Sequence, residues 1–279
     1  MKNQDTLKTD WKYLIILDAC RYDYFEKNHS RFIQGKLERR RSPATYTQEW
    51  LQKTFPNYYP DIIYISPIFF CNSIKSLQKN GFNGREHFYK ISDAWEHGWD
   101  EEYGTVPPWY IYRNAILNAM AYPNKKIVIH FFQPHAPYLS IKPKQPRPRT
   151  HTKENTKEYI QIKKTNTLLR KLSSIYHRMF GTENLWRLTG LLGMETNSNM
   201  EQTWRRIGRQ GIQQAYEKNL CTALFFVEKL TRRLPSGKII VTADHGELLG
   251  EKKYWGHGPP KPYLPELTDV PWLEVERKK

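Results

Sequence analysis

Cysteine is scarce in this sequence, and long apolar runs are missing. The three cysteines, Cys20, Cys71 and Cys221, are far apart and odd in number, which fits neither a metal-binding knuckle nor a disulfide framework. No apolar run approaches the roughly 20 residues of a transmembrane helix. The polar N-terminal residues also lack the apolar centre of a signal peptide. These absences predict a cytoplasmic protein with no transmembrane segment, although peripheral contact with a membrane stays open.

Acidic residues are too few to balance the basic ones. Lys and Arg number 44 against 28 Asp and Glu, which gives a net charge of +16. Between Lys142 and Arg178 eleven basic residues face only two Glu, so this stretch alone carries +9. Such an excess attracts polyanions in general, but a solvated basic insertion explains it equally well. No helix-turn-helix or aromatic-basic module accompanies the charge, which argues against nucleic acid as a partner.

The sequence does contain a series of apolar segments, each followed by polar residues. Runs at 12–17, 61–66, 125–132 and 238–242 predict buried strands, and helical spacing predicts helices at 113–121 and 210–233. The chain of 279 residues is long enough for one large core. We therefore expect one α/β domain over 1–279, with helices on both faces of a mostly parallel sheet and a basic insertion at about 139–205.

Two of the expected strands end in carboxylates. Asp18 follows the first strand, and Asp244 and His245 follow the strand at 238–242. Ligands of open α/β sheets bind at the carboxyl ends of the strands, and a divalent cation accepts oxygen and nitrogen donors together. The structural alternatives are a helix N-cap for Asp18 and a hydrogen-bonded turn for Asp244 and His245. After Asp18, Arg21 and Asp23 are expected to pair and to orient the turn.

These segments resemble the alkaline phosphatase superfamily, in particular sulfatases, lipoteichoic acid synthases and phosphoethanolamine transferases. The similarity is carried by Leu-Asp-Ala-x-Arg-x-Asp at 17–23, Asp-His-Gly-Glu at 244–247, Leu-Gly-Glu at 249–251 and His-Gly at 257–258. It implies the alkaline phosphatase-like three-layer fold, with a last core strand at 270–275. It also implies that Asp18, Asp244 and His245 bind one divalent metal ion (Mn, Zn, Mg or Ca), with a second ion left open.

The resemblance also implies an oxygen nucleophile at the start of a helix. The polar residues 35–41 are expected to form a loop that leads into this helix. Thr45 precedes Glu49 by four positions and Trp50 by five, the spacing of the nucleophile in lipoteichoic acid synthases. Thr45 is therefore preferred over Thr47 as nucleophile and metal ligand, while helix capping is the alternative for either hydroxyl. The sulfatase signature Cys-x-Pro-Ser-Arg is absent, which argues against a formylglycine-dependent sulfatase.

Two further histidines match positions that act on substrate in the family. His135, in Pro-His-Ala-Pro-Tyr, resembles a histidine that contacts sulfate or phosphate, and His257 stands where sulfatases usually have Lys. His130, inside a strand, is expected to be a core histidine. The resemblance implies metal-dependent hydrolysis or transfer of phosphate (or sulfate) esters on an anionic glycan, lipid or polymer. A catalytically inactive polyanion-binding protein and a true sulfatase are the alternatives.

Overall fold

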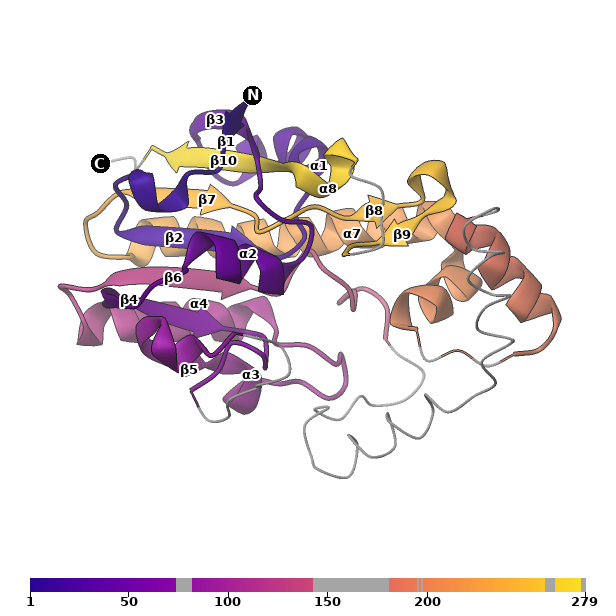
Figure 1. Cartoon of the computed structure of the whole chain (residues 1–279), viewed down its shortest axis with the longest axis horizontal. Coiled ribbons are helices and arrows are strands. Elements are labelled where there is room, and N and C mark those ends of the chain that lie inside the picture. Colours follow the sequence, from indigo (N-terminus) through magenta and orange to yellow (C-terminus); the bar gives the residue numbers. More distant parts are fainter. Residues whose placement is uncertain (74–81, 143–180, 195, 197, 259–263, 277–279) are drawn as a thin grey trace.

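The centre of the protein is an eight-stranded sheet with the strand order β1-β3-β10-β7-β2-β6-β4-β5 (Figure 1). The computed structural model describes residues 1–73, 82–142, 181–194, 196, 198–258 and 264–276. The strands of the sheet are β1 (Lys2–Asn3), β2 (Tyr13–Leu17), β3 (Gly35–Arg41), β4 (Tyr59–Ser66), β5 (Phe88–Asp93), β6 (Lys126–Phe131), β7 (Ile239–Thr242) and β10 (Asp269–Val275). A separate two-stranded sheet consists of β8 (Leu248–Leu249) and β9 (Trp255–Gly256).

Most neighbouring strands run in the same direction. β2 is parallel to both β6 and β7, and β4 is parallel to both β5 and β6. Only β10 breaks this pattern among the described strands of the large sheet, because it pairs antiparallel with β3 and with β7. The expected mostly parallel sheet is confirmed.

Helices cover both faces of the sheet. They are α1 (Tyr22–Asn28), α2 (Thr47–Thr54), α3 (Ala94–His97), α4 (Pro108–Ala121), α7 (Asn199–Arg233) and α8 (Pro265–Thr268), with a further helix at 181–191. Figure 1 shows α2 in front of the strands, with α4 and α7 behind them. Side chains alternate between the two faces of a strand. Accordingly, Leu14 and Ile16 of β2 pack with Trp50 of α2, whereas Ile15 packs in the core that contains Leu224 of α7.

The expected loop at 35–41 is wrong, because these residues form β3. The strand pairs along its whole length with β10, and it stays polar because it lies near the edge of the sheet. Arg40 is buried with its guanidinium carbon 4.0 Å from the ring centroid of Trp272, and its Nη2 lies 2.9 Å from Glu38 Oε2. The strand therefore buries a charged side chain over an aromatic ring and lacks the apolar alternation on which sequence prediction depends.

The basic insertion expected at 139–205 falls mostly outside the described residues, which do not include 143–180. Its extent therefore stays a prediction. Helix α7 begins at Asn199 instead of the expected position 210, and it is interrupted at Gly208, where φ is 66°. None of the helices that the structure describes is both long enough and apolar enough to cross a bilayer.

Candidate metal centre and active site

Three central strands bring acidic and imidazole side chains to the same edge of the sheet. Asp18 directly follows β2, His130 lies near the end of β6, and Asp244 comes two residues after β7. Because β6 and β7 both run parallel to β2, their carboxyl ends meet. The candidate ligand atoms of Asp18, His130 and Asp244 lie within 4.8 Å of one another, and all three residues are buried. We call these three residues the inner cluster.

Each side chain of the inner cluster has a buried polar atom that needs a partner. Within the described part of the chain, no hydrogen-bond partner reaches Asp18 Oδ1, His130 Nε2 or Asp244 Oδ2. A buried polar atom without a partner costs about 1–3 kcal/mol, and more if it is charged. Three such atoms at one point, from two carboxylates and an imidazole, form a donor set that suits a divalent cation. The residues present therefore fit a metal ion.

The electrostatics of the inner cluster agree with this fit. Burial, together with repulsion from Asp244 and Glu247, raises the pKa of Asp18 well above its ordinary value. Burial lowers the pKa of His130 to about 4, which leaves the imidazole neutral and able to bind a cation. The other ring nitrogen, Nδ1, lies 2.6 Å from the hydroxyl oxygen of Tyr64, which is itself fully buried. A positive charge between the carboxylates would oppose the repulsion that raises the pKa of Asp18.

His245 extends the inner cluster towards a threonine. Its Nε2 lies 3.3 Å from Asp244 Oδ2 and 3.7 Å from Asp18 Oδ1. Its Nδ1 lies 2.8 Å from the carbonyl oxygen of Gly246, so Nδ1 carries the proton and donates. The unprotonated Nε2 then faces the Oγ1 of Thr47 at 3.2 Å, and the hydroxyl can donate to it. His245 therefore presents a lone pair to the space shared by the two carboxylates and the threonine.

The two candidate threonines differ in their contacts. Thr47 is the first residue of α2, and the N-cap is Tyr46, which makes no side-chain capping bond. Capping by either threonine, the structural alternative, is therefore wrong. Thr45 precedes the helix and makes backbone contacts: its N–H donates to Glu49 Oε2 at 3.4 Å, and its carbonyl accepts from the N–H of Gly258 at 3.1 Å. The structure thus brings the hydroxyl of Thr47 to His245 and uses the backbone of Thr45 to connect two loops.

A second group, which we call the outer cluster, consists of His135, Glu247 and His257. Candidate ligand atoms of these three residues also lie within 4.8 Å of one another. Nδ1 of His257 lies 3.2 Å from both carboxylate oxygens of Glu247. Burial alone would raise the pKa of Glu247, but attraction to His257, then to His135 and His245, lowers it to about 2. Glu247 is therefore ionised and pairs with the imidazole of His257.

The outer cluster adjoins the inner one and stands on loops. The ring centroids of His257 and His245 are 4.4 Å apart, and those of His257 and His135 are 5.0 Å apart. Asn219 of α7 holds the His135 loop, because its amide donates to the carbonyl oxygens of His135 and Pro137 at 3.3 and 3.2 Å. Nδ1 of His135 donates to the carbonyl of Ala136. Its Nε2 is therefore the ring nitrogen that is left for substrate.

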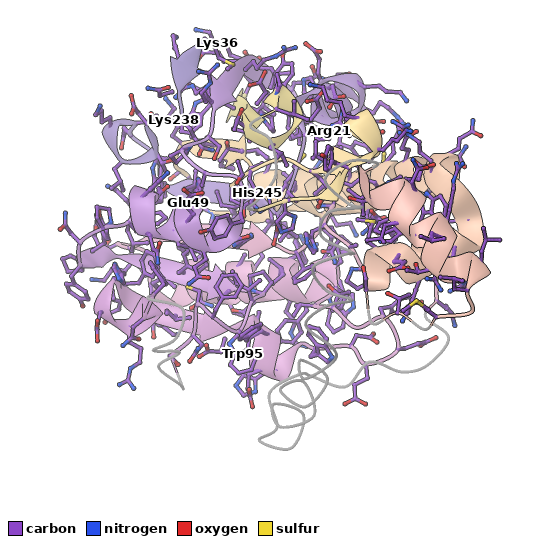
Figure 2. The ribbon with its side chains drawn as sticks, turned by 45° about the vertical axis from the view of Figure 1, so that its right-hand side comes forward. Arg21, Lys36, Glu49, Trp95, Lys238 and His245 are labelled. Atoms are coloured by element: carbon purple, nitrogen blue, oxygen red, sulfur yellow. The ribbon has the colours of Figure 1, made fainter. Side chains whose placement is uncertain are left out.

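The two clusters meet at a cavity of about 390 Å³. Its lining contains Asp18, Thr47, His135 and His257 together with a largely aromatic group of side chains. Figure 2 shows His245 near the centre of the molecule, above Trp95, which belongs to this aromatic group. Of the residues predicted from the sequence, the structure gathers Asp18, Asp244, His245, His135 and His257 here, together with Thr47.

Sequence reasoning missed the roles that His130 and Glu247 take in these clusters. His130 was expected in the core, and it is fully buried, but its Nε2 lies 3.7 Å from Asp18 Oδ2. The available signal was its place in a strand that runs beside the one ending in Asp18. Glu247 stands in the Asp-His-Gly-Glu segment itself. The predicted pairing of Arg21 with Asp23 is confirmed at 2.7 Å, and Arg21 also reaches Glu251 at 2.6 Å.

No family of known sequences matches the chain, and no curated protein matches it either. Several solved structures share its fold. The integral membrane lipooligosaccharide phosphoethanolamine transferase EptA of Neisseria meningitidis has a TM-score of 0.53 at 13% identity, over 99% of this chain and 50% of that one. The zinc complex of the C-terminal periplasmic domain of EptC from Escherichia coli has a TM-score of 0.51 at 11% identity, over 98% and 76%. The chain has the alkaline phosphatase-like fold.

A putative sulfatase from Bacteroides thetaiotaomicron is similar too, with a TM-score of 0.50 at 11% identity over 96% of this chain and 66% of that one. The resemblance found in the sequence is thus confirmed for the fold. The chain spans about half the length of EptA. The EptC domain holds zinc and is periplasmic, whereas the metal and the cytoplasmic location of this chain stay predictions.

Proposed function

We propose that this chain is a metal-dependent enzyme that hydrolyses or transfers phosphate or sulfate esters. The observation that carries the proposal is the set of three buried ligand atoms of the inner cluster beside the hydroxyl of Thr47. The phosphoethanolamine transferase and sulfatase names of its structural neighbours support this class of reaction. His257, where sulfatases usually have Lys, favours phosphate esters. An anionic glycan, lipid or polymer remains the expected substrate.

The metal ligands in this proposal are Asp18, Asp244 and His245, with His130 as a further candidate. The zinc in the EptC neighbour favours zinc among Mn, Zn, Mg and Ca. A divalent cation bound here would lower the pKa of the nearby hydroxyl and offset negative charge on the ester oxygens. The outer cluster could hold a second ion, but Glu247 and His257 already neutralise each other. We therefore propose one resident ion.

Thr47 is the proposed nucleophile, in place of the Thr45 preferred from spacing. The support is the 3.2 Å contact of its hydroxyl with His245 and its place at the start of α2, where backbone N–H groups favour negative charge. Its hydroxyl would lose its proton to solvent as its oxygen bonds to the phosphorus (or sulfur) atom and the bond to the alcohol oxygen breaks. The phosphoryl (or sulfuryl) group held as a threonine ester would then be transferred to water or to a second alcohol, which frees Thr47.

His257 and His135 have the proton-transfer roles in this proposal. A protonated His257, stabilised by its ion pair with Glu247, would give a proton to the departing alcohol. His135 is neutral, since burial and the neighbouring His257 lower its pKa, and its Nε2 would contact an ester oxygen or accept a proton from the incoming nucleophile. Both side chains line the cavity beside Thr47.

A matched pair of variants tests this assignment. The wild type, Thr47→Ala and Thr45→Ala should be assayed on phosphate monoesters, phosphate diesters and sulfate esters with Zn, Mn, Mg and Ca. We expect Thr47→Ala to lose roughly three orders of magnitude of turnover while Thr45→Ala stays within about tenfold. Mass spectrometry of the peptide from Ser42 to Trp50 should detect the esterified threonine. The reverse pattern would return the role to Thr45, and a wild type inert on every ester would remove the enzyme proposal.

A further inference from the structure

The lining of the active-site cavity includes a group of side chains that the proposed chemistry does not use. This group is formed by apolar and mostly aromatic side chains, which we call the aromatic wall: Ile68, Phe69, Phe70, Trp95, Trp99 and Phe132. Phe69 and Phe70 pack edge to face with their centroids 5.4 Å apart. Phe132 packs in the same way against the ring of His135 at 5.1 Å. The wall therefore reaches directly to a histidine of the outer cluster.

Few charged side chains are among the described residues that line this cavity. Asp18 is the only acidic side chain among them, and no Lys or Arg is among them. A second anionic group of a substrate would find no Lys or Arg on this wall, and an ammonium group would find no carboxylate on it. The chain as a whole carries a net charge of +16, which further disfavours a cationic ligand.

We propose that the aromatic wall binds an uncharged, apolar group, aryl or branched alkyl, as the alcohol part of the ester. This inference rests on the proposed function, because that function places the phosphate or sulfate group between Thr47 and His257. It narrows the proposed substrate class from anionic esters in general to esters whose phosphate or sulfate is their only charged group and contacts the two clusters. The cavity of about 390 Å³ has room for both parts.

The aromatic wall should favour large apolar groups over small ones, because its main contribution to the free energy of binding is the burial of apolar surface area. An apolar group buried among rings gains in proportion to the area that it removes from water, and ring–ring contacts add to this. The rings of the wall are packed against the core clusters of the protein, so they are already ordered. We expect at least a tenfold gain in affinity for a phenyl over a methyl group.

Binding of phosphonates to the full-length, zinc-loaded protein tests this inference without turnover. Phosphonates keep the anionic group but have no ester bond to break. Calorimetry should give phenylphosphonate a dissociation constant at least tenfold below that of methylphosphonate. In a second comparison of matched shape, 3,3-dimethylbutylphosphonate should bind more tightly than 2-(trimethylammonio)ethylphosphonate. Equal affinities within either pair, or no binding of phenylphosphonate, would overturn the inference, and tighter binding of the cation would make the wall a cation–π site.

Variants of the wall link the effect to named rings. Phe70→Ala should reduce the ratio of phenylphosphonate to methylphosphonate affinity at least threefold, and Trp99→Ala provides an independent second case. Phe225→Ala is the matched control, because Phe225 lies on α7 outside the cavity and is 42% exposed. An unchanged ratio in both wall variants, each folded by circular dichroism, would contradict the inference.

The inference and the proposed function can fail separately. If phenylphosphonate binds with the expected preference but no ester is turned over, the result supports the apolar binding site and contradicts the enzyme proposal. If esters are turned over through Thr47 without preference for apolar alcohols, the enzyme proposal stands and the wall is wrong.

Discussion

The inner and outer clusters lie side by side and contain similar residues, yet their charges are balanced in opposite ways. The inner cluster sets two carboxylates against a neutral His130, and it leaves three buried atoms without partners among the described residues. The outer cluster sets the single carboxylate of Glu247 against two imidazoles, one of which pairs with it at 3.2 Å. The inner cluster therefore suits a cation from outside, whereas in the outer cluster an imidazole already pairs with the carboxylate.

The two clusters also differ in what holds them. Asp18, His130 and Asp244 stand in or directly after paired strands of the central sheet. His135 and His257 stand on loops, and one of these loops is held by Asn219. Rigid strands suit the fixed geometry of a metal ion, while loops can adjust around a substrate. The difference in charge balance and in support favours different roles for two similar sets of residues.

The largest expected effect comes from Asp244→Asn, which removes a proposed ligand of the inner cluster and keeps the shape of the side chain. Bound zinc, measured by plasma mass spectrometry, should fall at least tenfold, and turnover should fall by about three orders of magnitude. If Asp244→Asn kept its metal, Asp244 would not be a ligand, and the contrast drawn between the two clusters would be wrong.

Glu247→Gln is the matching change in the outer cluster. It removes the charge that stabilises a protonated His257, so we expect turnover to fall about 100-fold. The zinc content should stay within about twofold of wild type, because Glu247 is not among the proposed ligands. Loss of metal in this variant would show that the outer cluster holds an ion as well.

Tyr64→Phe tests the buried hydroxyl that contacts His130. Without it, Nδ1 of His130 loses its partner at 2.6 Å, and the ring is less well oriented towards Asp18. Removal of such an orienting partner typically weakens metal binding by about 10–100-fold, and we expect a value near the lower end. A competition titration with a zinc chelator measures this change, and an unchanged affinity would exclude His130 as a ligand.

The smallest effect concerns the stability of the metal-free protein. The pKa of Asp18 is raised in the folded state, so ionising this side chain destabilises the metal-free fold as the pH rises through and above its unfolded pKa of about 3.9. Asp18→Asn should therefore raise the melting temperature of the metal-free protein by a few degrees at pH 8. The difference should vanish near pH 3, and added zinc should stabilise the wild type only. A variant less stable than wild type at pH 8 would contradict the charge balance described for the inner cluster.

Much of the fold could be predicted from the sequence because most strands of the sheet are apolar. Buried parallel strands such as β2 and β6 are nearly continuous apolar runs, and polar residues behind them indicate the ligand side of the sheet. Asp18, Asp244 and His245 could be identified in this way. Strand β3 could not, because its charged residues are satisfied by pairing with β10 and by the contact of Arg40 with Trp272, which come from the other end of the chain.

The choice between Thr45 and Thr47 could not be made from the sequence for a similar reason. Spacing to Glu49 and Trp50 cannot tell where the first turn of α2 begins, and two residues decide which hydroxyl points to His245. His130 was equally ambiguous, since a histidine within an apolar strand has the same pattern in a core and in a metal site. Both questions depend on contacts between segments that are distant in the sequence.

The positions of the two clusters along the chain have a consequence for folding. The inner cluster joins residues from Asp18 to Asp244, and the outer cluster joins residues from His135 to His257, so contacts between distant parts of the sequence must form before either cluster exists. Such long-range closure is slow, and it comes late in folding. A zinc-sensitive signal from the inner cluster should therefore appear only when β2, β6 and β7 have all paired, and it would report the completion of the folding reaction itself.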